Sequence, residues 1–231
     1  DEDIILRIIH DAKLDSSLYF HYVKALSDFD FNNIYHPTKE GLKYMPIPYG
    51  SIFLHTLLYK FSNFGGGYIL IELLCIFLFL LIFYSIFILL NFNKLFSLLL
   101  ATLLFCSPSI AVLTKLESIP EIYTFAQHFY NLRFPRPLVA NIYLYLFIYL
   151  MIFINGEKVF NKKNGLYLGV IMGLSFSSFF NIFIFQAIAL FFLLIYNFKK
   201  KIIYNLYKNY GFILYISFSF LFIAIPFLLL I

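Results

Sequence analysis

The residues best suited to chemistry lie in the first part of this 231-residue chain. Eight of its twelve acidic residues fall within the first forty positions, and the strongest pattern among them pairs Asp15 with Tyr19. This spacing places the carboxylate and the aromatic ring on one face of a helix, which the sequence predicts near Ser16–Asp28. An oriented carboxylate can take or give a proton, so the acidic segment is a candidate active site.

Further candidates follow along the chain. Glu72 lies just inside an apolar run, where a carboxylate is unfavourable and often functional; a hydrogen bond to a neighbouring helix is the alternative. Glu117 and Glu121 either lie on the solvated face of a loop, or one of them supplies the candidate site with a second carboxylate that acts on a metal or on an acceptor. Arg133 and Arg136, separated by Phe-Pro and followed by a second proline, are either snorkelling interfacial anchors or a rigid binding pair.

The composition indicates where these side chains operate. A hydrophobic fraction of 62% with only 13% charged residues, and a mean hydropathy of +0.86, exclude an ordinary soluble domain. The net charge of +5 is not a nucleic-acid signal, because the basic residues flank apolar runs and form no stripe. We therefore predict an all-α polytopic membrane protein without a nucleic-acid partner.

Apolar helices must position the candidate residues. We expect an external loop with a short helix over 1–46, an interfacial helix over 47–61 that is too short to span a membrane, and a transmembrane domain over 62–231. Within this domain the glycines at 65–67 act as a hinge. The apolar runs predict about six membrane helices, over 68–90, 95–114, 138–154, 165–178, 180–196 and 210–231.

The stretch 165–196 decides the topology. As one helix its residues would extend roughly 48 Å, against a hydrocarbon core of about 30 Å. Basic groups bracket both of its ends, so the stretch must enter and return if both groups stay cytoplasmic. The polar centre with Ser175, Ser177, Ser178 and Asn181 is where such a broken or re-entrant pair would turn. The alternative is a single long tilted helix.

The distribution of charge sets the orientation. The lysines of the second half of the chain form two groups, and the positive-inside rule assigns both groups to the cytoplasm. The acidic residues then gather on the outer side, with Glu72 near the outer end of its helix. The two groups are Lys158/Lys162/Lys163 and Lys199/Lys200/Lys201/Lys208.

This layout resembles the GT-C superfamily of polytopic glycosyltransferases, which includes the protein O-mannosyltransferases and the aminoarabinose transferases. Asp15, Tyr19 and Pro46-Ile-Pro48-Tyr49 match the family's first external loop, which carries an acid, an aromatic four residues on, and a proline turn before an interfacial helix. The segment Gly165–Leu174, which runs into a polar break, resembles the broken helix pair of that fold. Ser16 departs from the pattern, because family members often have Glu at that position.

The resemblance implies a sugar transfer from a polyprenyl-phosphate-linked donor to a lipid, glycan or protein acceptor, on the outer face of a bacterial inner membrane. Asp15 would be the general base that activates the acceptor hydroxyl. Arg133 and Arg136 would bind the leaving phosphate. Tyr19, Glu72 and Glu117 would complete the substrate site. The partners are then the donor and membrane lipids; the cofactor is unknown, and a divalent cation is an option.

Two other functions compete with this one. A transporter or flippase for a lipid-linked or polar solute would use Glu72 and the broken pair as a site at the membrane midplane, but no internal repeat supports it. A polysaccharide polymerase or ligase of another membrane fold also places arginines in outer loops.

Other motifs add little. Cys75 and Cys106 sit in apolar runs and are expected to face lipid or other helices. The five histidines show no metal-ligand spacing and are assigned structural or surface roles. No phosphate-binding or dinucleotide-binding glycine loop occurs. A start without Met and an end inside an apolar run favour a segment of a longer protein.

Overall fold

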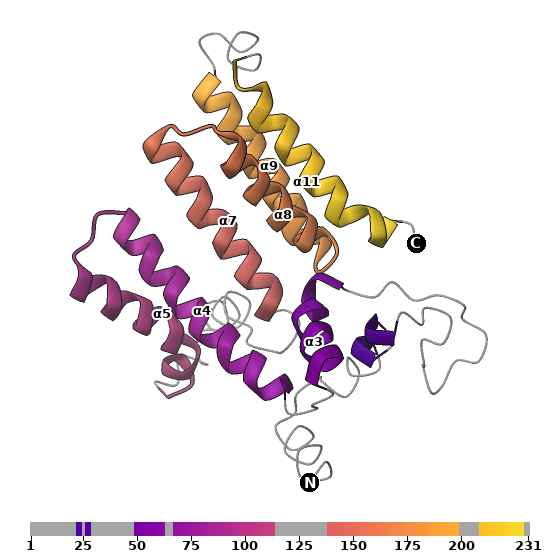
Figure 1. Cartoon of the computed structure of the whole chain (residues 1–231). Helices are drawn as coiled ribbons and strands as arrows, with labels where there is room; N and C mark the ends of the chain where they lie inside the picture. Colours follow the sequence, from indigo (N-terminus) through magenta and orange to yellow (C-terminus); the bar gives the residue numbers. More distant parts are fainter. Residues whose placement is uncertain are drawn as a thin grey trace.

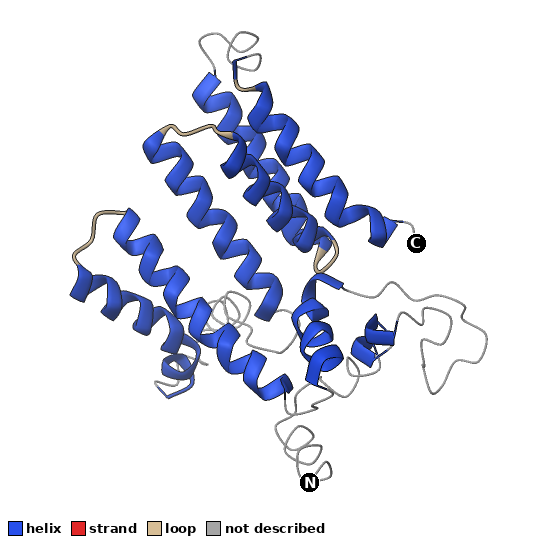
Figure 2. Ribbon diagram, in the orientation of Figure 1, coloured by secondary structure: helices blue, strands red, loops and turns tan. Residues whose placement is uncertain are grey.

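The computed structural model describes residues 22–24, 26–28, 49–62, 67–113, 138–198 and 208–228. This part of the chain is helical and contains no strand, which confirms the all-α class for it (Figure 2). Its principal helices are α3 (Tyr49–Ser62), α4 (Gly67–Leu89), α5 (Lys94–Leu113), α7 (Leu138–Glu157), α8 (Lys162–Phe176), α9 (Phe180–Phe198) and α11 (Tyr210–Leu228).

The long helices form a bundle in which successive helices alternate in direction (Figure 1). The short turns α4–α5 and α7–α8 lie at one end of the bundle, which we call the basic end because Lys94, Lys158, Lys162 and Lys163 flank these turns. The helix α3 and the α8–α9 turn lie at the opposite end, which we call the α3 end.

By length and composition, two helices in the described part of the chain could each cross a membrane: α7 and α9. Shorter apolar helices cover Leu73–Leu89, Lys94–Cys106 and Tyr210–Pro226. The outward faces carry large apolar side chains, among them Leu95, Phe192 and Phe222, which are 71%, 62% and 69% exposed. Exposed apolar faces of this extent are typical of surfaces that contact lipid, so the fold is consistent with a membrane protein.

The apolar stretch 165–196 is two antiparallel helices and not one long helix. Ser177, Ser178 and Phe179 form the turn between α8 and α9. The backbone N–H groups of Ser177 and Phe179 donate to Gly173 and Ser175, at 3.1 and 2.8 Å, which closes the end of α8. The turn thus falls on the serines that the sequence marks as its polar centre.

Helix α7 joins two cores. Its first half, from Leu138 to Tyr145, packs in one cluster with α4, where the Tyr145 ring lies 4.7 Å from Phe83 and 5.2 Å from Phe79. Its second half packs in another cluster with α8, α9 and α11. The two clusters therefore share one helix, and α7 aligns the α4–α5 pair with the α8–α9–α11 group.

Three glycines bring α8 against α11. Gly165, Gly169 and Gly173 recur at intervals of four residues and thus lie on one face of α8. A Cβ added at Gly165 or Gly169 would overlap the carbonyl oxygen of Phe212 or Ile216, and one added at Gly173 would lie 2.7 Å from the Cβ of Ile223. Small residues at this spacing let two membrane helices approach to backbone contact. The α8–α11 interface is the most extensive helix contact of the described bundle.

We expect Gly169→Ala to destabilise the bundle, because its Cβ would overlap both the Ile216 carbonyl and the Ser219 hydroxyl. Overpacking of this kind costs about 1–3 kcal/mol, and should lower the melting temperature followed by circular dichroism in detergent. Gly156→Ala is the matched control, because nothing lies within 4 Å of its added Cβ. Equal melting temperatures for the two variants would show that the interface tolerates the methyl group.

Candidate functional site

A cluster of buried polar residues lies at the α3 end, where α3 meets α7 and the α8–α9 turn. We call it the polar junction and define it as Ser51, His55, Tyr143, Ser175, Ser177, Ser178 and Gln186. All except Tyr143 are at most 5% exposed, and Tyr143 is 9% exposed. Buried polar side chains need partners, so their hydrogen bonds decide what the junction can do.

A glycine allows α3 to reach the junction. Gly50 lies in the first turn of α3, and a Cβ added there would overlap the carbonyl oxygen of Leu174 and lie 2.9 Å from the Ser177 hydroxyl. The Pro46-Ile-Pro48 segment precedes this turn in sequence. The absence of a side chain at Gly50 therefore lets the beginning of α3 rest on the end of α8.

Two hydrogen bonds hold α3 in this position. The hydroxyls of Ser51 and Ser178 are bonded to each other, although 127 positions separate them in sequence. The Tyr143 hydroxyl donates to the carbonyl oxygen of Gly50. Ser177 donates back to the carbonyls of Gly173 and Leu174, at 3.1 Å each. Helix α3 is thereby bonded to both α7 and the α8–α9 turn.

The junction also holds two side-chain oxygens that no described residue pairs. Gln186 in α9 is fully buried, and its Nε2 donates to the Tyr143 carbonyl at 3.4 Å. Within the described part of the chain, its Oε1 and the Oγ of the fully buried Ser175 have no hydrogen-bond partner. Leaving a buried polar group unpaired costs about 1–3 kcal/mol. Such oxygens can accept a hydrogen bond from a bound molecule or a water.

His55 adds an ionisable group next to this network. It follows Ser51 by four residues on the same face of α3 and is only 2% exposed. Burial away from water lowers the pKa of His55 to about 3. The imidazole is therefore neutral near pH 7, and it contributes a polar ring and no positive charge.

The predicted site residues fall almost entirely outside the described residues. Glu72 lies in the second turn of α4, but its side chain is not among those described. A shared site of carboxylates and arginines thus stays a prediction. The predicted site residues that lie outside the described residues are Asp15, Tyr19, Glu117, Arg133 and Arg136.

A metal site has no candidate within the described ranges, where no group of three or more His, Cys, Asp and Glu side chains could hold an ion. Cys75 is buried in the α4 core, and Cys106 is half-buried on α5. The structure therefore identifies no ligand set for a divalent cation in this region.

The sequence did not predict the polar junction as a cluster, although it singled out the serines of the α8–α9 turn. Ser51 and His55 lie four apart directly after the proline turn, which is the signal that could have marked them. Gln186 stands alone in an apolar run and offers a second signal. The chain matches no protein-family model, no curated protein and no solved structure. Its function is therefore inferred from its own residues.

Tyr143→Phe should weaken the attachment of α3, because the Gly50 carbonyl loses its donor while it stays close to buried groups. Loss of one partner of a buried hydrogen bond costs about 1–3 kcal/mol. The readout is the melting temperature in detergent, with Tyr167→Phe as the control, since Tyr167 is 44% exposed. An unchanged melting temperature in Tyr143→Phe would contradict a structural role for this hydrogen bond.

The stability of the fold should fall in mild acid because of His55. The folded state keeps the ring neutral down to about pH 3, whereas an unfolded chain binds a proton near pH 6.5. Stability from this residue is therefore intact above pH 6.5 and decreases as the pH falls toward 3.

Near pH 5 the loss should reach about 2 kcal/mol. Melting temperatures of the wild type and of His55→Gln, measured near pH 7.5 and near pH 5, check this expectation. The variant should lose less stability on acidification than the wild type does. If both lose the same amount, the acid sensitivity comes from another group.

Proposed function

We propose that this chain is the membrane domain of a glycosyltransferase, which transfers a sugar from a polyprenyl-phosphate-linked donor to a lipid, glycan or protein acceptor on the outer face of a bacterial inner membrane. The observation that carries the proposal is the attachment of the segment before α3 to the bundle. Val23 has no exposed surface and belongs to the same core cluster as Ile52 and Leu138. A transferase needs its acidic first segment held against the helices, whereas a connecting loop does not.

The membrane topology in this proposal uses α4, α5, α7, α8, α9 and α11 as six membrane helices. The fifteen residues of α8 extend about 22 Å, which is less than the roughly 30 Å of a hydrocarbon core. The α8–α9 turn would then lie below the outer surface as part of a broken pair. Non-helical backbone at that depth must be covered by protein, and α3 supplies the cover for Ser177 and Ser178, which are 3% and 5% exposed.

Charge supports the same orientation. Lys94, Lys158, Lys162 and Lys163 flank the turns at the basic end, which the positive-inside rule assigns to the cytoplasm. The α3 end then faces outward. Catalytic side chains at this end would be able to contact a lipid-linked donor in the outer leaflet.

Chain connectivity supports a site at the α3 end. Arg136 precedes the buried Leu138 by two residues, so their Cα atoms are at most about 7 Å apart. Asp15 precedes Tyr22 by seven residues, a reach of at most about 25 Å. In the proposed site Asp15 removes the proton of the acceptor hydroxyl, and Arg133 and Arg136 stabilise the phosphate that leaves. Tyr19, Glu72 and Glu117 would contact the substrates.

One observation favours a transporter or flippase as the second candidate. Gln186 and Ser175 carry buried oxygens without partners in the described part of the chain, and both belong to helices of the broken pair. Polar groups inside a membrane often mark a solute pathway. In this alternative the polar junction would bind the solute itself.

Asp15→Asn should reduce sugar transfer by about 10²–10⁴-fold, since the acceptor loses its base. Release of polyprenyl phosphate from polyprenyl-phosphate hexoses and pentoses in proteoliposomes is the measurement. Asp28→Asn is the matched control, because Asp28 belongs to the same segment and is exposed.

Full transfer by Asp15→Asn would rule out its role as base. Gln186→Leu separates the two functions. A transporter would lose solute or lipid translocation in Gln186→Leu and keep it in Asp15→Asn. A transferase would lose sugar transfer in Asp15→Asn and keep it in Gln186→Leu. Both variants should be checked for membrane insertion.

A further inference from the structure

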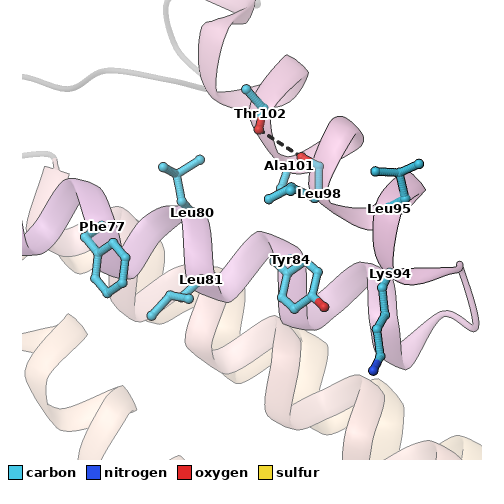
Figure 3. Close-up of a pocket in the computed structure, with 9 residues that line it drawn as sticks. All are labelled: Phe77, Leu80, Leu81, Tyr84, Lys94, Leu95, Leu98, Ala101 and Thr102. Carbon is cyan, nitrogen blue, oxygen red and sulfur yellow. Dashed lines mark hydrogen bonds between the residues drawn. The ribbon is translucent and has the colours of Figure 1, made fainter.

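A groove runs between α4 and α5, and Figure 3 shows the side chains that line it. Its volume is about 600 Å³. Apolar side chains from both helices form its walls, including Phe77 and Leu81 from α4 and Leu98 from α5. Among the described residues that line it, Lys94 is the only charged one.

The groove exists because α5 is an edge helix. Within the described bundle α5 packs chiefly against α4, through the small side chains of Ser97 and Ala101, which are 0% and 1% exposed. Leu95 and Leu98 beside them are 71% and 56% exposed. Small residues at the contact and large ones at the rim leave an apolar channel that opens to the surroundings.

One end of the groove carries a positive charge. Lys94 is the first residue of α5, and Figure 3 shows its ammonium group at the same end of the groove as the Tyr84 hydroxyl. Asn93 accepts the N–H groups of Phe96 and Ser97, at 2.7 and 2.8 Å. The N–H groups of Lys94 and Leu95 have no acceptor within the helix, and the helix dipole adds positive potential there.

We propose that this groove binds an anionic glycerophospholipid, with an acyl chain along Phe77, Leu81 and Leu98 and the phosphate at Lys94 and the Tyr84 hydroxyl. From Phe77 to Tyr84 the α4 wall extends about 10 Å, which matches the upper part of an acyl chain and leaves the rest in the bilayer. Lys94 lies at the basic end, and the cytoplasmic leaflet to which that end is assigned is the one whose negative surface potential attracts lysines.

This occupant is distinct from the proposed sugar donor. The donor would act at the α3 end, and the head of this groove lies at the opposite end of α4 (Figure 1). The phospholipid would pack the α4–α5 edge and hold it at a fixed depth in the leaflet. The site does not depend on the transferase chemistry.

Tryptophan quenching by brominated lipids tests the proposal, because the chain contains no tryptophan of its own. Leu98→Trp puts an indole into the groove, and Leu103→Trp, on a residue 55% exposed on the same helix and outside the lining, is the control. Each variant is reconstituted in phosphatidylcholine vesicles that contain brominated phosphatidylglycerol or brominated phosphatidylcholine.

We expect brominated phosphatidylglycerol to quench Leu98→Trp at a mole fraction roughly fivefold lower than brominated phosphatidylcholine requires, as a single lysine near an anionic lipid predicts. Leu103→Trp should show no preference. Adding Lys94→Gln should abolish the preference at Leu98→Trp, and Lys94→Arg should keep it. Lys94 is exposed, so neither change disturbs a packed core.

Native mass spectrometry of the chain without an added tryptophan gives an independent measurement. The wild type should retain more phosphatidylglycerol than Lys94→Gln. Equal retention, or equal quenching of Leu98→Trp by both lipids, would overturn the proposal. Displacement of the brominated phosphatidylglycerol by undecaprenyl phosphate at a lower mole fraction than by unlabelled phosphatidylglycerol would also overturn it, and would identify a polyprenyl phosphate as the occupant.

Discussion

The contact of α8 with α11 is the interaction on which the rest of this bundle depends. Lipid tails are as apolar as leucine, so membrane helices gain little from burying apolar surface against each other and must gain from close packing. Gly165, Gly169 and Gly173 supply that packing, because at these three positions no Cβ separates α8 from the backbone of α11. Phe176 and Phe183 then close the gap toward α9, with their rings 5.2 Å apart.

The position of α8 controls the polar junction. With α8 held against α11, its last turn presents the Leu174 carbonyl to Gly50 and the adjoining turn presents Ser178 to Ser51. Tyr143 reaches the same part of α3 from α7. One short helix therefore covers the turn of a hairpin that would otherwise expose polar backbone, and it does so at the end where the chemistry is proposed.

The two ends of the bundle are different in kind. At the α3 end polar groups are buried, and burial keeps His55 neutral. At the basic end lysines remain exposed: Lys162 lies over the ring of Tyr215 and Lys163 over that of Tyr167, each 5.8 Å from the ring centroid. Aromatic rings and lysines at a helix end are typical of a membrane interface. This division agrees with the proposal of a site at the α3 end and of anchoring at the basic end.

Much of the helical layout follows from the sequence. The turn at Ser177–Phe179 lies where serines interrupt an apolar stretch too long for one helix, and α4 and α5 meet at Asn91, whose φ of 66° suits a tight turn. These features are local: the length of an apolar run and the residues that break it are visible in the chain itself. The glycine spacing of α8 can also be read from the sequence, but the helix that packs against it, α11, cannot.

The sequence by itself therefore determined the all-α class of the described residues, the turn that divides the stretch 165–196 and the segregation of acids from lysines. Only the tertiary structure decided that Gly50 rests on Leu174, that Gln186 meets Tyr143, and that α4 and α5 enclose a groove headed by Lys94. The physical reason is that helix formation and membrane preference depend on neighbours a few residues apart. The choice of which helix faces meet depends on how well the side chains of one helix fit those of another. These side chains are far apart in the chain, and their fit is decided only when the helices pack together.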